Sequence, residues 1–332
     1  MKVLVTGGAG YIGSHTCKLL KNSGHDPVVF DNLSTGNRAL VRFGSMHHGD
    51  INDASALRKV FAAEKPDAVI HFAASAYVGE SMRIPRTYYR NNISGTLNLL
   101  DTMADAGVMK LVFSSSCATY GVPPVIPIRE DSPQSPINPY GESKLFGETM
   151  MKAMVATGDL DCIALRYFNA SGADPEGEIG ELHDPETHII PLVLSALAGH
   201  NNKFSIMGDD YDTPDGTCIR DYLHVNDLAR AHLLALQALT GKPGFDAFNL
   251  GTGHGLSVRE VVTAAQRVTG KTLDAVVGPR RPGDPPSLVA DASKAAQGLG
   301  WTPTHSDIDT ILSTAWVWMH AANNPFNALG TY

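Results

Sequence analysis

The sequence has no long hydrophobic run and few cysteines. No stretch of the 332 residues approaches the roughly 20 consecutive apolar residues that a membrane span requires, so a membrane-spanning protein is not expected. The cysteines form no Cys-x-x-Cys pair and are widely spread, at Cys17, Cys117, Cys162 and Cys218. This spacing predicts buried structural thiols in a reducing compartment and no zinc site. The opening residues, MKVLVTGG, lack the features of a secretory signal, so a cytoplasmic location is expected.

Positive charge is also scarce. The chain carries 26 Lys and Arg residues against 34 Asp and Glu residues, and its formal net charge is -8. This balance argues against a nucleic-acid partner. An anionic ligand would have to be held by individually placed groups. The chain also lacks internal repeats and low-complexity tails.

The first half of the chain alternates short apolar runs with amphipathic stretches. The runs, which predict buried strands, are at 2–6, 27–30, 67–73, 110–116 and 162–168. The stretches, which predict helices, are at 11–23, 53–64, 86–106 and 139–156. This rhythm is typical of a doubly wound parallel sheet, a Rossmann-like α/β fold that binds ligands at the carboxyl ends of its strands.

The rhythm breaks near residue 168, where long loops rich in Gly, Pro and Asp begin. Loops of that length are usually functional. We therefore expect a nucleotide-binding domain over 1–168. Residues 169–332 are expected to form mainly a smaller, mixed α/β substrate-binding lobe over the ligand edge, with some segments returning to the large domain.

A glycine-rich loop joins the first predicted strand to the first predicted helix. Gly7, Gly10 and Gly13 allow a tight turn and a close backbone approach to a pyrophosphate, which would face the amides near Tyr11 and Ile12. A plain turn is the alternative interpretation of these glycines.

An acidic residue stands where a dinucleotide site needs one. Asp31 ends the second predicted strand 18 residues after Gly13, where a carboxylate accepts hydrogen bonds from ribose hydroxyls and repels a 2′-phosphate. NAD is therefore favoured over NADP, although Asp31 and Asn32 could instead form a simple turn. Asp50 and Ile51 follow a further predicted strand and could border the adenine, and a helix cap is the alternative.

Tyr140 and Lys144 lie four residues apart on a predicted helix, so they share one face. A nearby ammonium favours the phenolate, which makes Tyr140 a usable proton acceptor at neutral pH. Ser116 ends the preceding strand at the ligand edge, where its hydroxyl can hydrogen-bond the same substrate oxygen. The alternatives are an ordinary helix surface for the pair and strand-end turn chemistry for the serines from Ser114 to Ser116.

Together these segments resemble the UDP-galactose 4-epimerases of the extended short-chain dehydrogenase/reductase family. The resemblance runs from Met1 to about Trp301. It rests on TGGAGYIGSH, the end of the second strand at 31–33, GDI at 49–51, HFAA at 71–74, Asn91, SSSCATYG at 114–121, PYGESK at 139–144, RYFNASGA at 166–173, RDYLHVNDLA at 220–229 and PRRPGD at 279–284.

The resemblance implies a role for each matching residue. The catalytic residues would be Ser116, Tyr140 and Lys144. The NAD site would comprise Gly7, Gly10, Tyr11, Ile12, Gly13, Asp31, Asn32, Asp50, Ile51, Phe72, Ala73, Ala74, Asn91, Ser114, Tyr140, Lys144 and Phe168. The UDP-sugar would contact Ser116, Tyr140, Asn169, His188, Ser205, Met207, Arg220, Arg281, Asp284 and Leu288. Two positions depart from other members: Ala76 replaces a lysine that reaches the cofactor in some of them, and Leu288 is intermediate between residues that exclude and admit N-acetylated sugars.

The resemblance further implies reversible oxidation at C4′ of a UDP-hexose, with transient hydride transfer to tightly bound NAD through a 4-keto sugar. Dehydratases of the wider family carry acidic residues directly after the catalytic hydroxyl, whereas this chain has Cys117, Ala118 and Thr119. A UDP-pentose or UDP-N-acetylhexosamine epimerase, or a non-catalytic NAD-binding regulator, remains an alternative. By analogy with the family, a homodimer is expected.

Overall fold

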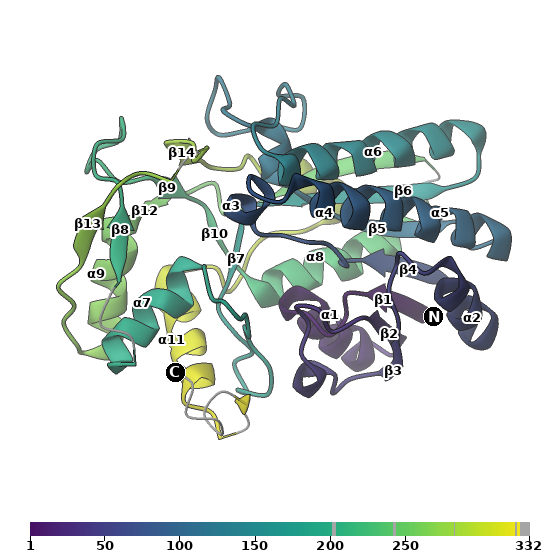
Figure 1. Cartoon of the computed structure of the whole chain (residues 1–332), viewed down its shortest axis with the longest axis horizontal. Coiled ribbons are helices and arrows are strands. Elements are labelled where there is room, and N and C mark those ends of the chain that lie inside the picture. Colours follow the sequence, from purple (N-terminus) through teal and green to yellow (C-terminus); the bar gives the residue numbers. More distant parts are fainter. Residues whose placement is uncertain (201–203, 242–243, 282, 323, 326–332) are drawn as a thin grey trace.

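The computed structural model describes residues 1–200, 204–241, 244–281, 283–322 and 324–325. Figure 1 shows a large lobe, in which helices cover both faces of one sheet, and a smaller lobe of short strands and helices beside it. No helix within these described ranges is long and apolar enough to cross a membrane.

The large sheet is entirely parallel, with the strand order β11-β6-β5-β4-β1-β2-β3. The order reverses at the neighbours β1 and β4, and open α/β sheets bind ligands at such a switch point. The strands are β1 (Lys2–Thr6), β2 (Asp26–Asp31), β3 (Ser45–His48), β4 (Ala68–His71), β5 (Lys110–Ser116), β6 (Asp161–Tyr167) and β11 (Phe245–Leu250).

Alternating strand residues feed two apolar cores, one on each face of the sheet. Val3 and Val5 join the core beneath α1 (Tyr11–Asn22), α8 (Val225–Ala238) and α10 (Ser293–Leu299). Leu4, between them, joins the opposite core, which is covered by α2 (Ala54–Glu64), α5 (Gly95–Ala106) and α6 (Pro139–Thr157). Both faces are buried, which explains why these strands are almost continuously apolar.

The smaller lobe has its own core. Its helices are α7 (Ile189–Ala198), α9 (Val258–Thr269) and α11 (Ile308–Met319), and they pack through buried residues such as Val193, Val261 and Ile311. Its short strands are β8 (Ser205–Met207) with β13 (Val276–Gly278), and β9 (Ile219–Arg220) with β12 (Leu256–Ser257) and β14 (Ser287–Leu288). The pair β7 (Asn169–Ser171) and β10 (Tyr222–His224) runs between the two lobes (Figure 1).

The doubly wound fold predicted from the sequence is confirmed, with two differences. The single helix predicted at 86–106 is divided into α4 (Pro85–Tyr89), a widened turn at 90–94 and α5. The sheet also gains β11 as an edge strand that was not predicted individually; β11 and α8, which covers it, are segments of the second half that return to the large lobe. A short helix, α3 (Val78–Ser81), follows the loop after β4.

Candidate active site

The glycine loop lies against the end of β4 at the switch point. Gly7 has φ +75, and a Cβ there would lie 2.6 Å from the Ala73 nitrogen. A Cβ on Gly13 would lie 2.3 Å from the Gly7 oxygen, so neither position has space for a side chain. At Gly10 the nearest atom would be 3.2 Å away.

The start of α1 is suited to an anion. Gly10 is the N-cap residue and supplies no side-chain acceptor, and the first turn contains no acidic residue. The first amides of a helix have no partner within it, and the helix dipole favours negative charge there. These features fit the pyrophosphate of a dinucleotide.

Asp31 organises the same loop. Its carboxylate is buried and accepts hydrogen bonds from the amides of Ala9, at 3.0 Å, and Leu33, at 2.8 Å. Burial raises the pKa of Asp31, and these hydrogen bonds oppose the rise. The carboxylate therefore takes part in a turn, as the alternative interpretation supposed, and also holds the glycine loop in place.

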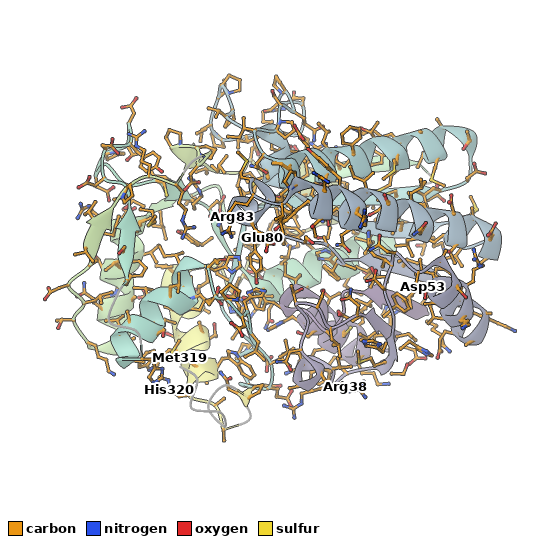
Figure 2. The ribbon with its side chains drawn as sticks, in the orientation of Figure 1. Arg38, Asp53, Glu80, Arg83, Met319 and His320 are labelled. Atoms are coloured by element: carbon orange, nitrogen blue, oxygen red, sulfur yellow. The ribbon has the colours of Figure 1, made fainter. Side chains whose placement is uncertain are left out.

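Asn32 and Asp50 connect the ends of β2 and β3. The Asn32 amide donates to the Asp50 carboxylate at 2.9 Å. Asp50 is not the cap of α2, because Asp53, labelled in Figure 2, accepts hydrogen bonds from the amides of Ser55 and Ala56. Ile51, next to Asp50, is buried.

The structure brings Ser116, Tyr140 and Lys144 together at the ends of β5 and α6. Asn138 caps α6 by accepting from the Gly141 amide at 2.8 Å, which fixes the turn that carries Tyr140. All three side chains are less than one-tenth exposed. The Lys144 ammonium lies 5.9 Å from the centre of the Tyr140 ring and donates to the Ser114 carbonyl at 2.7 Å.

In the protein without cofactor, Lys144 does not lower the pKa of Tyr140, contrary to the sequence interpretation. Burial raises the pKa of Tyr140 to about 12, and a hydrogen bond with Ser116 only partly opposes this. Burial also lowers the pKa of Lys144 to about 7. A low-dielectric site disfavours both charges, and the ammonium points to a carbonyl and not to the phenol.

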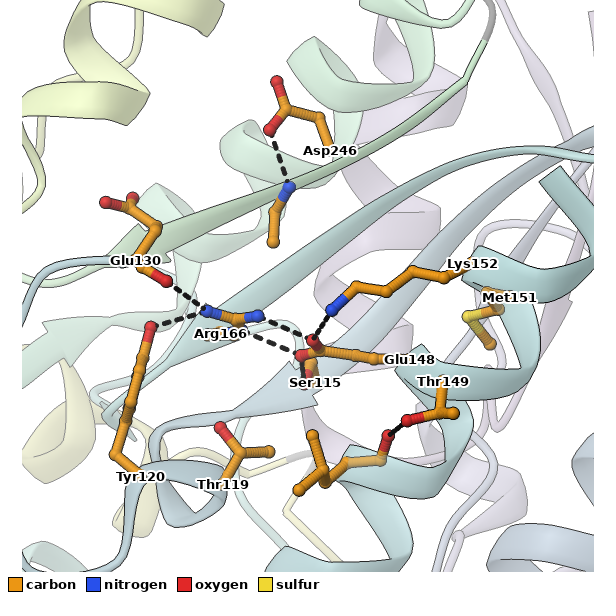
Figure 3. A network of polar contacts seen from close by, with 12 residues as sticks. Ser115, Thr119, Tyr120, Glu130, Glu148, Thr149, Met151, Lys152, Arg166 and Asp246 are labelled. Carbon is orange, nitrogen blue, oxygen red and sulfur yellow. Dashed lines mark hydrogen bonds and ion pairs between the residues drawn. The ribbon is translucent and has the colours of Figure 1, made fainter. Parts of the chain in front are cut away.

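A buried ion pair supports this group from behind, and sequence reasoning missed it. Glu148 lies one helical turn beyond Lys144 and accepts two hydrogen bonds from Arg166, at 2.8 and 2.6 Å (Figure 3). Ser115 also donates to Glu148, at 2.6 Å, and Arg166 donates to the Tyr120 hydroxyl at 2.7 Å. A charged residue inside the apolar run CIALRYF was the signal that could have revealed the pair.

Asn92 is a second residue that the sequence did not single out. It is buried in the widened turn at 90–94, and its amide donates to Ser143 at 2.9 Å and to the Ser75 carbonyl at 3.0 Å. It thereby connects the loop after β4 to α6. The predicted NAD contact was its neighbour Asn91, whose oxygen accepts from Asn52 at 3.3 Å.

The other predicted cofactor residues surround the same edge. Phe72 stacks at a tilt against His232, with 4.6 Å between the ring centres. Ala73 and Ala74 follow on the same loop and are half-buried, and Ala76 is exposed. The Tyr11 hydroxyl donates to the Gly172 carbonyl at 2.5 Å, which links α1 to the loop that follows β7.

Several predicted sugar-side residues already contact one another. Leu288 shares a small buried cluster with Phe168, a residue predicted for the NAD site, and with Cys117, the residue after Ser116. Arg220 forms an ion pair with Asp284 and donates to the carbonyls of Ile219 and Pro285.

The remaining predicted contacts are more open. Ser205 and Met207 lie on one face of β8 and are half-buried, as is Asn169. Arg281 is exposed. His188 contacts two carboxylates: its Nδ1 lies 2.8 Å from Glu181 and 3.0 Å from Glu186. Burial alone would lower the pKa of His188, but these two negative charges outweigh it and raise the pKa to about 10.

A parallel sheet with this strand order, a glycine loop at its switch point and a Tyr-x-x-x-Lys pair beside a strand-end serine define a Rossmann-type enzyme that binds a dinucleotide. Residues 3–251 match the model of the NAD dependent epimerase/dehydratase family. The chain belongs to this family.

Two solved structures and one curated relative are similar over nearly the whole chain. A UDP-glucose 4-epimerase from Lacticaseibacillus casei is 52% identical over 96% of each chain. The UDP-glucose 4-epimerase from Brucella ovis, solved with NAD, is 54% identical, with a TM-score of 0.92 over 95% of this chain and 97% of that one. The enzyme from Bifidobacterium longum, solved with NAD+ and UDP, is 40% identical, with a TM-score of 0.94 over 98% of this chain and 100% of that one.

Proposed function

We propose that this chain interconverts UDP-galactose and UDP-glucose by reversible oxidation at C4′. The observation that carries the proposal is the convergence of Ser116, Tyr140 and Lys144 beside the glycine loop. The relatives described above bear the name of this activity and share about half of their residues with the chain.

NAD, when bound, supplies the hydride acceptor for this chemistry. Its diphosphate would lie at the amides of α1, where Gly10 presents no side chain, and its ribose at Asp31. Tyr140 accepts the proton of the 4′-hydroxyl and returns a proton to the same oxygen when the hydride comes back. Ser116 hydrogen-bonds Tyr140, which lowers the pKa of the phenol against the effect of burial. Lys144 is assigned to the nicotinamide ribose.

The residues after Ser116 support epimerisation over dehydration. Loss of water from the sugar needs an acid close to the reacting carbons. Burial raises the pKa of the Cys117 thiol to about 12, so it stays neutral, and the Thr119 hydroxyl donates to the Ser116 carbonyl at 3.0 Å. Neither is an acid, and Ala118 has no polar side chain. The 4-keto sugar therefore takes its hydride back.

The nucleotide end is assigned to the small lobe. Arg220 offers a buried guanidinium, and arginine matches the geometry of phosphate oxygens. Its ion pair with Asp284 holds both side chains in position, and we assign the diphosphate to Arg220 and the uridine ribose to Asp284. The remaining contacts are assigned to Asn169, His188, Ser205, Met207 and Arg281. Leu288, packed against Phe168 and Cys117, limits the space for the sugar.

Because Leu288 is of intermediate size, a substrate panel is the sharpest test of specificity. Purified protein is given UDP-hexoses, UDP-N-acetylhexosamines and UDP-pentoses without added NAD. We expect UDP-galactose to be converted to UDP-glucose with the highest kcat/KM. Preference for a pentose or an N-acetylated sugar would replace the assigned substrate, and no conversion of any sugar would favour a non-catalytic NAD-binding regulator.

We also propose that two copies of the chain pair through α5 and α6. Leu97 and Phe146 project from these helices and are 44% and 53% exposed. The helices run side by side on the outside of the large lobe (Figure 1), so these apolar side chains offer a surface that a second copy could cover. The net charge of -8 disfavours a nucleic-acid partner, and the cytoplasm remains the predicted location.

A further inference from the structure

The loop between β7 and α7 gathers four metal-ligating side chains. Glu181, His183, Glu186 and His188 each offer one donor atom, and these atoms all lie within 4.8 Å of one another. Both histidines direct Nδ1 at the same oxygen of Glu181, at 2.9 Å from His183 and 2.8 Å from His188.

The donor spacing resembles that of a tetrahedral metal site. Zinc binds histidine nitrogen and carboxylate oxygen at about 2.0–2.2 Å, which places neighbouring donors roughly 3.3 Å apart around a tetrahedron. Glu186 uses its two oxygens for different partners: the His188 Nδ1 lies 3.0 Å from one oxygen and the His183 Nδ1 lies 3.8 Å from the other, so the carboxylate reaches both histidines. The four donor atoms lie within 4.8 Å of one another, so some of them must move closer to reach that spacing around an ion.

The second carboxylate is already oriented. One oxygen of Glu186 accepts from the amides of Thr187, at 2.6 Å, and His188, at 2.8 Å. The other oxygen faces His183 and is available to a ligand. Metal ligands are commonly oriented in this way by hydrogen bonds from groups behind them.

Charge gives a further reason for a cation. Glu181 is only 8% exposed at its side chain and Glu186 is 21% exposed, so two negative charges lie close together with little water. One divalent ion would neutralise both carboxylates in place of the protons of the two imidazoles, whose pKa values the carboxylates raise against the effect of burial, and binding would release those protons. We propose that Glu181, His183, Glu186 and His188 form a site for one divalent transition metal of the Zn²⁺ type.

A second acidic group provides a contrast. Asp174, Glu176 and Glu178 also lie close together, but the Lys18 ammonium contacts all three, at 2.9, 2.5 and 2.7 Å. That group already holds a cation and offers no histidine. It supports no metal site.

The proposed ion would bind Nδ1 of His188, which leaves Nε2 of the same ring for the proposed UDP-sugar contact, and it would fasten the loop beside the predicted nucleotide site. His183 packs edge-on against Tyr11 of the glycine loop, with 6.3 Å between the ring centres, and His188 lies against Tyr77. The proposal departs from the expectation of no metal site, which considered the cysteines alone.

The test uses full-length protein treated with a chelator and then freed of it. Zn²⁺ is titrated by calorimetry and Co²⁺ by its visible absorption, and the melting temperature is measured with and without Zn²⁺. We expect one Zn²⁺ per chain, a tetrahedral Co²⁺ spectrum and a higher melting temperature with the metal. Glu186→Gln and His183→Gln should each weaken binding by at least about tenfold.

Two matched variants separate this site from adventitious binding. Glu176→Gln alters the group that Lys18 occupies, and His254→Ala removes an exposed histidine outside the cluster. Both should bind Zn²⁺ as the wild type does. Glu186→Gln keeps the shape of the side chain, so a loss of Zn²⁺ binding in this variant is not explained by misfolding, even where His183→Gln folds poorly. The proposal is overturned if the wild type takes up no saturable equivalent of Zn²⁺, or if Glu186→Gln binds the metal as tightly as Glu176→Gln.

Discussion

The buried position of Lys144 at the active site lowers the stability of the folded protein. Its ammonium is buried, and burial lowers its pKa from 10.5 to about 7. The folded protein therefore binds fewer protons than the unfolded chain between these values, so stability rises with pH from about 7 to 10.5 and is lowest below that window. Residues kept for function at such a cost are typical of active sites.

Replacing Lys144 should therefore separate stability from activity. In the cofactor-free protein, Lys144→Met is expected to increase the free energy of unfolding by roughly 1–4 kcal/mol near pH 7, because the buried charge is removed. The same change should reduce epimerase activity by roughly a hundredfold or more. Urea unfolding at pH 7 and at a pH near 10 measures the first effect, and the gain should shrink at the higher pH. A variant that is both less stable and fully active contradicts the assignment.

The glycine loop gives a second prediction at single residues. Gly13→Ala would place a Cβ 2.3 Å from the Gly7 oxygen, so the turn must open and NAD binding should fall by at least about tenfold. Gly79→Ala is the matched control, because a Cβ there meets nothing within 4 Å. Bound NAD can be measured after purification from its absorbance on release. Equal NAD content in the two variants would show that the loop does not hold the cofactor.

At the level of single residues, the sequence predicted which side chains meet but not their electrostatics. Helical spacing and the strand end were enough to bring Tyr140, Lys144 and Ser116 together. The pKa of Tyr140 and the bond from Lys144 to the Ser114 carbonyl depend on burial and on exact orientation, which spacing does not encode.

Among the secondary-structure elements, the Glu148–Arg166 pair connects α6 to β6, and Ser115 extends it to β5. These are the elements that carry Tyr140, Lys144 and Ser116. Breaking a buried pair leaves one charge without a partner, which is strongly destabilising. Because Glu148 lies one turn from Lys144, the pair also fixes the rotation of α6 about its axis.

Glu148→Gln should lower the free energy of unfolding by about 3–5 kcal/mol at pH 7. Burial alone would raise the pKa of Glu148, but Arg166 and Ser115 outweigh it and hold the pKa below its usual 4.5. The contribution of Glu148 to stability is therefore present above that value and is lost as the pH falls through the lowered pKa. The difference between variant and wild type should therefore shrink in acid. Urea unfolding at pH 7 and near pH 3 measures this, with Asp274→Asn at an exposed position outside α5 and α6 as the control. A constant difference across this range would exclude the charge of Glu148 as its source.

The strand and helix pattern of the first half was predictable because buried parallel strands are nearly continuous apolar runs. β3 was harder to define, since Ser45–His48 has no buried residue and its pairing with β2 depends on tertiary structure. The widened turn at 90–94 was likewise not visible, because the helical periodicity continues through it. β11 joins the sheet from residues 245–250, and no local pattern reveals such a distant pairing.

For the whole molecule, the exposed face of α5 and α6 gives a prediction about assembly. Phe146→Glu places a charge on the proposed symmetric interface, where two copies of the change would face each other, and should shift the protein from dimer to monomer. Val317→Glu is the control, because Val317 is also about half exposed but lies on α11 of the small lobe. Sedimentation velocity distinguishes the two species. A wild type that is monomeric at all accessible concentrations, or a Phe146→Glu protein that is still dimeric, would exclude this interface.

The central claim concerns the whole enzyme: Tyr140 moves a proton in a reversible oxidation from which NAD emerges unchanged. It is tested most directly by following UDP-galactose conversion and NADH absorbance together in wild type and Tyr140→Phe, without added NAD. The account predicts UDP-glucose formation by the wild type with no NADH accumulating in proportion to product, and a kcat lower by roughly 10²–10⁴-fold in Tyr140→Phe. Equal activity in the two proteins, or one NADH formed for each sugar consumed, would contradict it.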